Sequence, residues 1–261
     1  MIMEIKSELV DIIAESNMKF GHSGNNGVVS VIQQLLTEKK VISPLYPEQS
    51  ARLIYCPGLL DKPFYACGDS ETYEFVNSIL TMSFTEIRDE FIKHSATASD
   101  YASLSCFDEL SSGDWQSICL WKRGRFTKAS ESFPRLTECI EKIEHLLFQW
   151  RGEVSFLVLD SGAKIPAHYD WTNIQTTCHF GIICPKGSRL VVGGISKPWH
   201  AGECIFFDHS FIHTAENLSD SKRVVLLLNL VNPFLSEKEK FVFNSIGKLF
   251  GKNSERFDKN D

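Results

Sequence analysis

The side chains best suited to chemistry lie in two short stretches, one that begins His168-Tyr-Asp170 and a later one that ends at His213. On an extended strand, residues two apart point to the same face, so His168 and Asp170 could hold one metal ion together. His213 would then add a second imidazole from a later strand. Two histidines and one carboxylate on one side of an ion form the facial triad of non-haem iron(II) oxygenases, which leaves positions open for a co-substrate and oxygen.

Spacing alone leaves other interpretations open. His168-Tyr-Asp170 could form a surface turn, with His213 an unrelated histidine. A zinc hydrolase is a third possibility, but it would need a general base near the metal and has no use for the buried cation that Arg223 could supply from the start of an apolar strand.

The residues around these stretches resemble the aspartyl/asparaginyl β-hydroxylase family, whose members use iron(II) and 2-oxoglutarate. The family's start and entry segment are matched by Pro57-Gly-Leu59, Lys62-Pro-Phe64, Gly113-Asp-Trp115, Leu120-Trp121 and Gly124-Arg125. Its first metal strand and the strand after it are matched by Pro166-Ala-His168, Asn173, His179-Phe-Gly181 and Pro185. Its second metal strand and its co-substrate arginine are matched by Trp199-x-x-Gly202, Phe207-Asp208, Ser210-Phe-x-His213 and Arg223. The resemblance covers roughly residues 53 to 235.

The resemblance implies roles for six side chains. His168, Asp170 and His213 would ligate iron(II), Arg223 would bind the distal carboxylate of 2-oxoglutarate, and His179 and Trp115 would contact the same co-substrate. A guanidinium suits a carboxylate in a dry pocket because it offers a bidentate match.

The family's pattern varies between glycine and aspartate at position 170, and the chain departs from the pattern at position 177. Some members have glycine in place of Asp170, which would leave two protein ligands, and some have an arginine where this chain has Thr177. Lys222 is the alternative cation to Arg223, but adjacent strand residues face opposite ways.

The activity implied by the resemblance is hydroxylation of an unactivated carbon, with iron(II) as cofactor and 2-oxoglutarate and oxygen as co-substrates. The first candidate is the β-carbon of an aspartyl or asparaginyl group in a small molecule, a peptide or a carrier-bound amino acid. The alternative is a non-catalytic cupin-like binding or sensing protein, although such a protein need not keep Arg223. The other histidines, His209 included, have no matching position and are interpreted as unrelated to the site, and Trp199 as structural.

Charge and hydropathy exclude several classes of function. The net charge of −6 at pH 7 argues against a nucleic-acid partner, which would require clustered lysine and arginine. No apolar run approaches the length of a membrane span, and four acidic residues interrupt the apolar residues of the first seventeen positions, where a signal peptide would lie. We therefore expect a cytoplasmic enzyme with no membrane attachment. Its eight scattered cysteines contain no Cys-x-x-Cys pair and should be free thiols.

The pattern of apolar residues predicts an α+β domain. Helical spacing predicts helices over residues 1–18, 28–40, 71–93 (with a possible break at Met82-Ser83) and 134–148, and another after Ser236. Short β-rich runs follow residue 153, which favours a sandwich or barrel, and the resemblance implies a double-stranded β-helix (a cupin-like jelly-roll) braced by the N-terminal helices. We expect residues 1–50 to form a helical extension packed on the core, 51–235 the catalytic domain, and 236–261 a last helix and a polar tail.

Overall fold

The strands after residue 152 pass back and forth between two antiparallel sheets, with one hairpin that stays within the smaller sheet. The computed structural model describes residues 2–22, 26–37, 46–95, 102–103 and 115–252. One sheet contains β10 (Cys204–Phe207), β7 (Gln175–Ile183), β12 (Arg223–Val231) and β5 (Glu153–Leu159) in that order. The other contains β6 (Lys164–His168), β11 (His213–Asn217), β8 (Ser188–Val192) and β9 (Ile195–Pro198) in that order. A chain that winds between two facing sheets in this order is a double-stranded β-helix, so the predicted fold class is confirmed.

Further strands widen the first sheet to eight. On one side β1 (Phe64–Tyr65) pairs with β10, and on the other β3 (Trp115–Lys122) pairs with β5. Two short strands, β2 (Ala102–Ser103) and β4 (Arg125–Phe126), pair with β3. The predicted loop from Ala96 to Gly113 falls, except for β2, outside the described residues.

The large sheet is buried on both faces, and its side chains alternate between two cores. Along β5, Phe156 and Val158 join a core beneath helices, whereas Leu157 and Leu159 join a core between the two sheets. Strand alternation therefore determines which side chains of the large sheet face the small sheet, where the candidate site lies.

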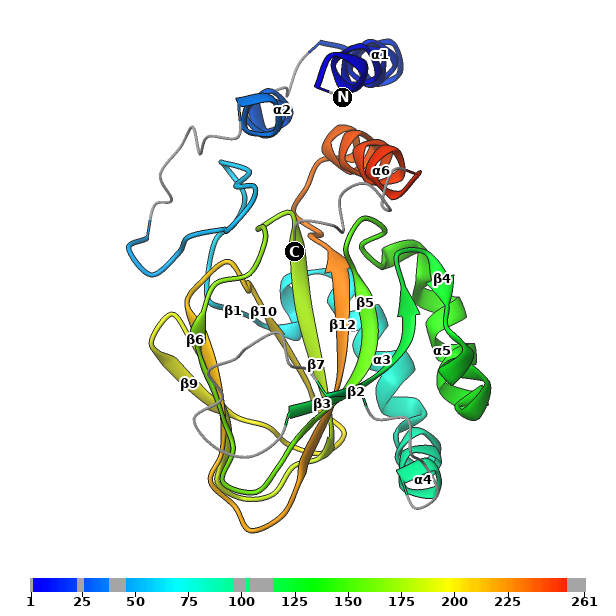
Figure 1. The fold of residues 1–261 in the computed structure, drawn as a ribbon, viewed down its shortest axis with the longest axis vertical. Helices are drawn as coiled ribbons and strands as arrows, with labels where there is room; N and C mark the ends of the chain where they lie inside the picture. The colour runs from blue at the N-terminus through cyan, green and yellow to red at the C-terminus, as the bar shows by residue number, and fades with distance from the viewer. Residues whose placement is uncertain (1, 23–25, 38–45, 96–101, 104–114, 253–261) are drawn as a thin grey trace.

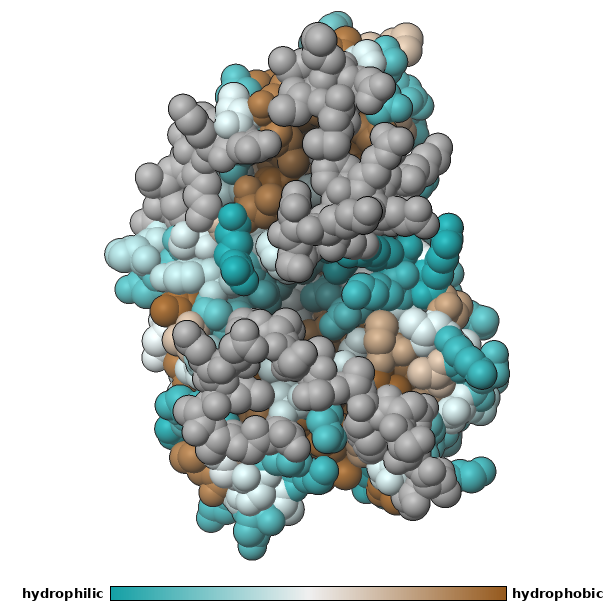
Figure 2. Space-filling view, in the orientation of Figure 1, coloured by the Kyte–Doolittle hydropathy of each residue, from teal (hydrophilic) through white to brown (hydrophobic). Residues whose placement is uncertain are grey.

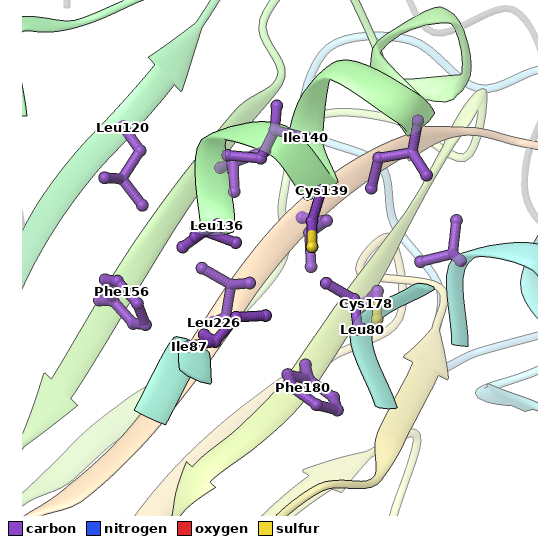
Figure 3. Close-up of a cluster of buried hydrophobic side chains, with 14 of the residues drawn as sticks. Leu80, Ile87, Leu120, Leu136, Cys139, Ile140, Phe156, Cys178, Phe180 and Leu226 are labelled. Atoms are coloured by element: carbon purple, nitrogen blue, oxygen red, sulfur yellow. The ribbon is translucent and has the colours of Figure 1, made fainter. Parts of the chain in front are cut away.

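Three helices cover the outer face of the large sheet: α3 (Glu71–Met82), α4 (Phe84–Ser95) and α5 (Pro134–Ile143) (Figure 1). Leu80, Ile87 and Leu136 from these helices lie in one cluster with Phe156 and Phe180 from the strands (Figure 3). The predicted break in the helix over 71–93 is confirmed at Ser83. The helix predicted over 134–148 is shorter than expected, because a 3-10 turn (η3, Glu144–Leu146) follows it. Two other 3-10 turns are η1 (Cys67–Asp69) and η2 (Lys128–Ser132).

The two N-terminal helices and the last helix meet at one end of the molecule (Figure 1). A third apolar core joins α1 (Ile2–Phe20), α2 (Asn26–Thr37) and α6 (Glu237–Lys252) to Trp150 and Ile174. Thus α1 and α2 pack with α6 at one end, whereas α3, α4 and α5, which also precede β5, brace the outer face of the large sheet. Figure 2 shows brown apolar atoms at this end and teal hydrophilic residues across the middle of the same face.

Two of the expectations from composition can be compared with this structure. None of the helices in the described ranges is long and apolar enough to cross a membrane. All seven described cysteines are free thiols, as predicted, and Cys106 lies outside the described residues.

Candidate metal centre

Two histidines lie side by side on neighbouring strands of the small sheet. His213 at the start of β11 is the antiparallel partner of His168 at the end of β6, and their ring centroids lie 4.1 Å apart. Side chains directly opposite each other on one sheet face are close neighbours. Strand pairing alone therefore brings together two imidazoles that are far apart in the sequence.

Backbone carbonyl groups fix the protonation of both rings. The Nδ1 atom of His168 lies 2.8 Å from the Pro166 carbonyl oxygen, and that of His213 lies 2.8 Å from the Phe211 carbonyl oxygen. A carbonyl oxygen can only accept, so each Nδ1 carries the proton and each Nε2 keeps its lone pair for a metal. A hydrogen bond of this kind also fixes the orientation of a metal-binding imidazole.

Asp170 completes the group, but it does so from a loop. The prediction that it shares a strand with His168 is wrong, because β6 ends at His168. Its Oδ2 atom lies 3.5 Å from Nε2 of His213, and one donor atom from each of the three residues falls within 4.8 Å of the others. Two neutral imidazoles and a carboxylate form a donor set that suits iron(II).

His209 holds Asp170 in place, so the interpretation of His209 as unrelated to the site is wrong. Its Nδ1 atom lies 3.2 Å from Oδ2 of Asp170, and its Nε2 donates to the Thr172 carbonyl oxygen at 2.9 Å. In return, the backbone N–H of Asp170 donates to the His209 carbonyl oxygen at 3.0 Å. The ring is only 3% exposed. No spacing rule in the sequence indicates this contact, because it joins two loops.

The electrostatics of the group favour the ionised carboxylate. Burial alone would raise the pKa of Asp170, but the hydrogen bond from His209 and the nearby imidazole of His213 reverse that effect and hold it well below its usual range. Burial acts against a charge on His209, yet its hydrogen bond to Asp170 raises its pKa. Burial and the neighbouring His213 lower the pKa of His168 to about 4, so this ring is neutral near pH 7.

Arg223 is a buried cation that faces the space between the sheets. It is 1% exposed, and it points to the same side of β12 as Val225, which belongs to the core between the sheets. Its guanidinium carbon lies 4.5 Å from the ring centroid of Trp199. Nε and Nη1 have no hydrogen-bond partner within the described part of the chain. Burial lowers its pKa to about 10, which still leaves it charged at neutral pH.

His179 lies on the line of contacts from the metal centre to this cation. Its ring centroid is 5.0 Å from that of Phe207 and 6.0 Å from that of Trp199, and Phe207 in turn is 5.9 Å from His213. Burial and the charge of Arg223 hold the pKa of His179 well below its usual range, so the ring is neutral.

The other residues singled out in the sequence occupy distinct places. Trp115 lies in the same cross-strand row as Arg223, with Leu159 between them. Thr177 accepts a hydrogen bond from the Asn229 amide at 3.3 Å. Lys222 lies at the surface, where it forms an ion pair with Asp160 at 3.1 Å, and does not face the pocket.

The sequence model of the family described as "Aspartyl/Asparaginyl beta-hydroxylase" matches residues 81–233, which contain all six of the proposed site residues. The chain belongs to this family. The match agrees with the resemblance carried by the individual motifs.

Relatives within the aspartyl/asparaginyl β-hydroxylase family match parts of the chain. It is 40% identical over 92 residues to "Aspartate beta-hydroxylase domain-containing protein 2" of Mus musculus, a match that covers 34% of this chain and 27% of the relative. It is 25% identical over 185 residues to "Aspartyl/asparaginyl beta-hydroxylase" of Homo sapiens, covering 70% of this chain and 24% of that protein. The chain thus spans about a quarter of the length of these relatives.

Among solved structures, a viral collagen prolyl hydroxylase from Paramecium Bursaria Chlorella virus-1, in a 2OG complex, is similar with a TM-score of 0.36 and 11% identity. That similarity covers 57% of this chain and 91% of the viral protein.

Proposed function

We propose that this protein is an iron(II)- and 2-oxoglutarate-dependent dioxygenase that hydroxylates an unactivated carbon. The observation that carries the proposal is the pairing of two sites on facing sheets. One is the His168–Asp170–His213 group, and the other is a buried arginine that has no carboxylate partner in the described residues.

The chain's own residues match the needs of both small molecules. The neutral Nε2 atoms of His168 and His213 and the carboxylate of Asp170 would hold iron(II) on one side, leaving the opposite side open. Arg223 would bind the distal carboxylate of 2-oxoglutarate, which would supply the acceptors that Nε and Nη1 lack among the described residues. Surrounding apolar side chains keep water away from that ion pair, which strengthens it.

When bound, iron(II) supplies the oxidative chemistry by which one oxygen atom of O2 enters a C–H bond of the substrate and the other converts 2-oxoglutarate to succinate and carbon dioxide. The protein's part is to orient the co-substrate between Arg223 and the metal ligands and to fix the protonation of both histidines. The first candidate substrate is an aspartyl or asparaginyl group, in a free amino acid, a peptide or a carrier-bound form, hydroxylated at its β-carbon.

The test is formation of succinate from 2-oxoglutarate by purified protein with iron(II), with and without candidate substrates, followed by mass spectrometry for a gain of one oxygen atom. His213→Ala should abolish succinate formation and weaken iron binding. His145→Ala, a change at an exposed histidine in η3, should leave both unchanged. Binding of 2-oxoglutarate without any succinate formation would instead indicate a sensing protein.

Arg223→Ala should weaken 2-oxoglutarate binding and leave iron(II) binding nearly intact. An unpaired buried carboxylate costs about 3–5 kcal/mol, on the order of a hundredfold or more in affinity. Lys222→Ala is the matched control, because it removes a neighbouring cation that lies at the surface. Equal losses in the two variants would contradict the assignment of Arg223.

A further inference from the structure

Trp199 lies beside Arg223, and its role goes beyond packing. We propose that the Trp199 indole N–H is a second donor to the dicarboxylate co-substrate, so that Trp199 and Arg223 together form the pocket for its distal carboxylate. The inference rests on the proposed function, because it names a further binding group of the same site.

The first observation is a buried donor with no acceptor. Trp199 is 2% exposed, and within the described residues its Nε1 atom has no hydrogen-bond partner. A buried N–H group without an acceptor carries its full desolvation cost, so nearly all such groups in proteins are paired with protein, water or a ligand. The indole N–H therefore requires an acceptor that the described part of the protein does not provide.

The second observation is that another set of unpaired donors lies next to it. The guanidinium carbon of Arg223 lies 4.5 Å from the Trp199 ring centroid, and Nε and Nη1 of that guanidinium also have no described acceptor. The aromatic ring holds the cation in place through a cation–π contact. A carboxylate has two oxygen atoms and about four lone pairs, so one such group can accept from the guanidinium and the indole together.

The third observation is that the backbone fixes the position of the tryptophan. The turn that follows Trp199 rests on β7, where Gly202 N–H donates to the Gly181 carbonyl oxygen at 2.9 Å and Gly181 N–H donates to the Glu203 carbonyl oxygen at 3.0 Å. Gly181 is required there because a Cβ atom would overlap the His200 carbonyl oxygen. This close approach sets Trp199 beside His179, two residues before Gly181 on the same strand.

The chemistry of the pocket selects a diacid. One carboxylate would lie at Trp199 and Arg223, and the other would reach the metal past His179, whose ring centroid is 6.0 Å from that of Trp199. A monocarboxylate of equal length can occupy only one of these two ends. We therefore expect the pocket to prefer 2-oxoglutarate, and its analogue glutarate, over pentanoate.

The decisive variant is Trp199→Phe. It keeps a six-membered aromatic ring beneath the guanidinium and removes the five-membered ring that carries the N–H donor. Calorimetric titration of the iron(II) form with 2-oxoglutarate, in the absence of oxygen, should show a loss of affinity of about tenfold to a hundredfold. Iron(II) affinity should not change. Trp121→Phe is the matched control, because the Trp121 indole N–H is also buried but donates to Glu144 within the protein at 3.0 Å.

A second measurement uses the unaltered protein. In the zinc(II) form labelled with nitrogen-15, the Trp199 indole N–H resonance, assigned with Trp199→Phe, should shift at a lower concentration of 2-oxoglutarate or glutarate than of pentanoate. If 2-oxoglutarate binds but this resonance does not move, or if Trp199→Phe binds it as tightly as the parent, a water molecule satisfies the indole and the inference is overturned. If the parent protein binds neither diacid, the proposed function fails and this inference with it.

Discussion

At the scale of single residues, the proposed third metal donor is a loop residue whose orientation depends on a neighbouring loop. Asp170 lies past the end of β6, so strand geometry does not fix its carboxylate. The contacts that fix it come from His209, through the ring and through the backbone carbonyl. We therefore expect Asp170 to act as a ligand only together with His209.

Asp170→Gly should weaken iron(II) binding more than Asp170→Asn does, and both should affect 2-oxoglutarate less than Arg223→Ala. Glycine removes the oxygen donor and the negative charge, whereas asparagine keeps an oxygen in nearly the same place. The measurement is an iron(II) titration without oxygen and with saturating 2-oxoglutarate. Parent-like iron binding by Asp170→Gly would mean that the site is a two-histidine centre.

His209→Leu should lower iron(II) affinity about tenfold to a hundredfold, the usual effect of removing a group that orients a metal ligand. His209→Asn should lose less, because its amide can still donate to Asp170. If the effect acts through Asp170, His209→Leu should add little in an Asp170→Gly background. Additive losses in this double-mutant cycle would show that His209 supports the fold in general and does not position the carboxylate.

The sequence predicted His168, His213 and Arg223 because strand alternation and family motifs both apply to them. It did not predict His209, whose significance depends on a contact between two loops that no periodicity encodes. It interpreted Trp199 as structural, because the sequence does not show that the turn after Trp199 rests on Gly181 or that the indole lies beside Arg223.

At the scale of elements, one acidic side chain joins three strands of the small sheet. Glu216 on β11 forms an ion pair with Lys164 on β6 at 2.5 Å and another with Arg189 on β8 at 2.6 Å. Its side chain is 9% exposed, while the two cations are about half exposed. The same strands present His168 and His213, so this triad supports the frame of the metal centre.

Glu216→Gln should lower the free energy of unfolding at pH 7 by about 1–2 kcal/mol, since two partly screened ion pairs are lost. Hydrogen bonds from Lys164 and Arg189 hold the pKa of Glu216 below its usual value, although partial burial opposes the shift. A lowered pKa means that the stabilisation is present above the pKa of the unfolded state and is lost as the pH falls through that of the folded state.

Urea unfolding of the parent and of Glu216→Gln at several pH values should therefore show a difference at pH 7 that shrinks below the ordinary glutamate range. Glu237→Gln is the control, because the ion pair of Glu237 with Lys240 is largely exposed on α6. A difference that grows as the pH falls would contradict the role of the ion pairs.

The ends of elements were less predictable than their existence. The break predicted at Met82-Ser83 is present in the structure. There Ser83 ends α3 and caps it through its backbone N–H. Apolar spacing predicted too long a helix from Pro134. The apolar pattern continues through Leu147, but the backbone changes to a 3-10 turn after Ile143. Apolar periodicity records which residues are buried, and it does not distinguish the type of helix that buries them.

At the scale of the whole molecule, the two ends of the chain form one structural unit. The sequence predicted a helical extension over residues 1–50 packed on the core and a last helix after residue 236, and Leu9, Val31 and Phe243 share one apolar core with Trp150 and Ile174. The sequence could not predict that the two ends pack on each other, because helices with apolar faces do not specify which partner covers them. None of the three candidate metal ligands belongs to this core.

Phe243→Ala should lower the free energy of unfolding by about 3–5 kcal/mol, because it removes a buried ring and leaves a cavity among three helices. Leu9→Ala should cost about 2–5 kcal/mol by the same mechanism, and the two changes should not be additive if α1 and α6 depend on one another. Val10→Ala is the control, since Val10 is 61% exposed.

Iron(II) and 2-oxoglutarate affinities of the folded Phe243→Ala and Leu9→Ala variants should equal those of the parent, because neither Phe243 nor Leu9 belongs to the core between the sheets. A loss of 2-oxoglutarate affinity in Phe243→Ala, measured well below its unfolding transition, would show instead that the terminal helices shape the catalytic site.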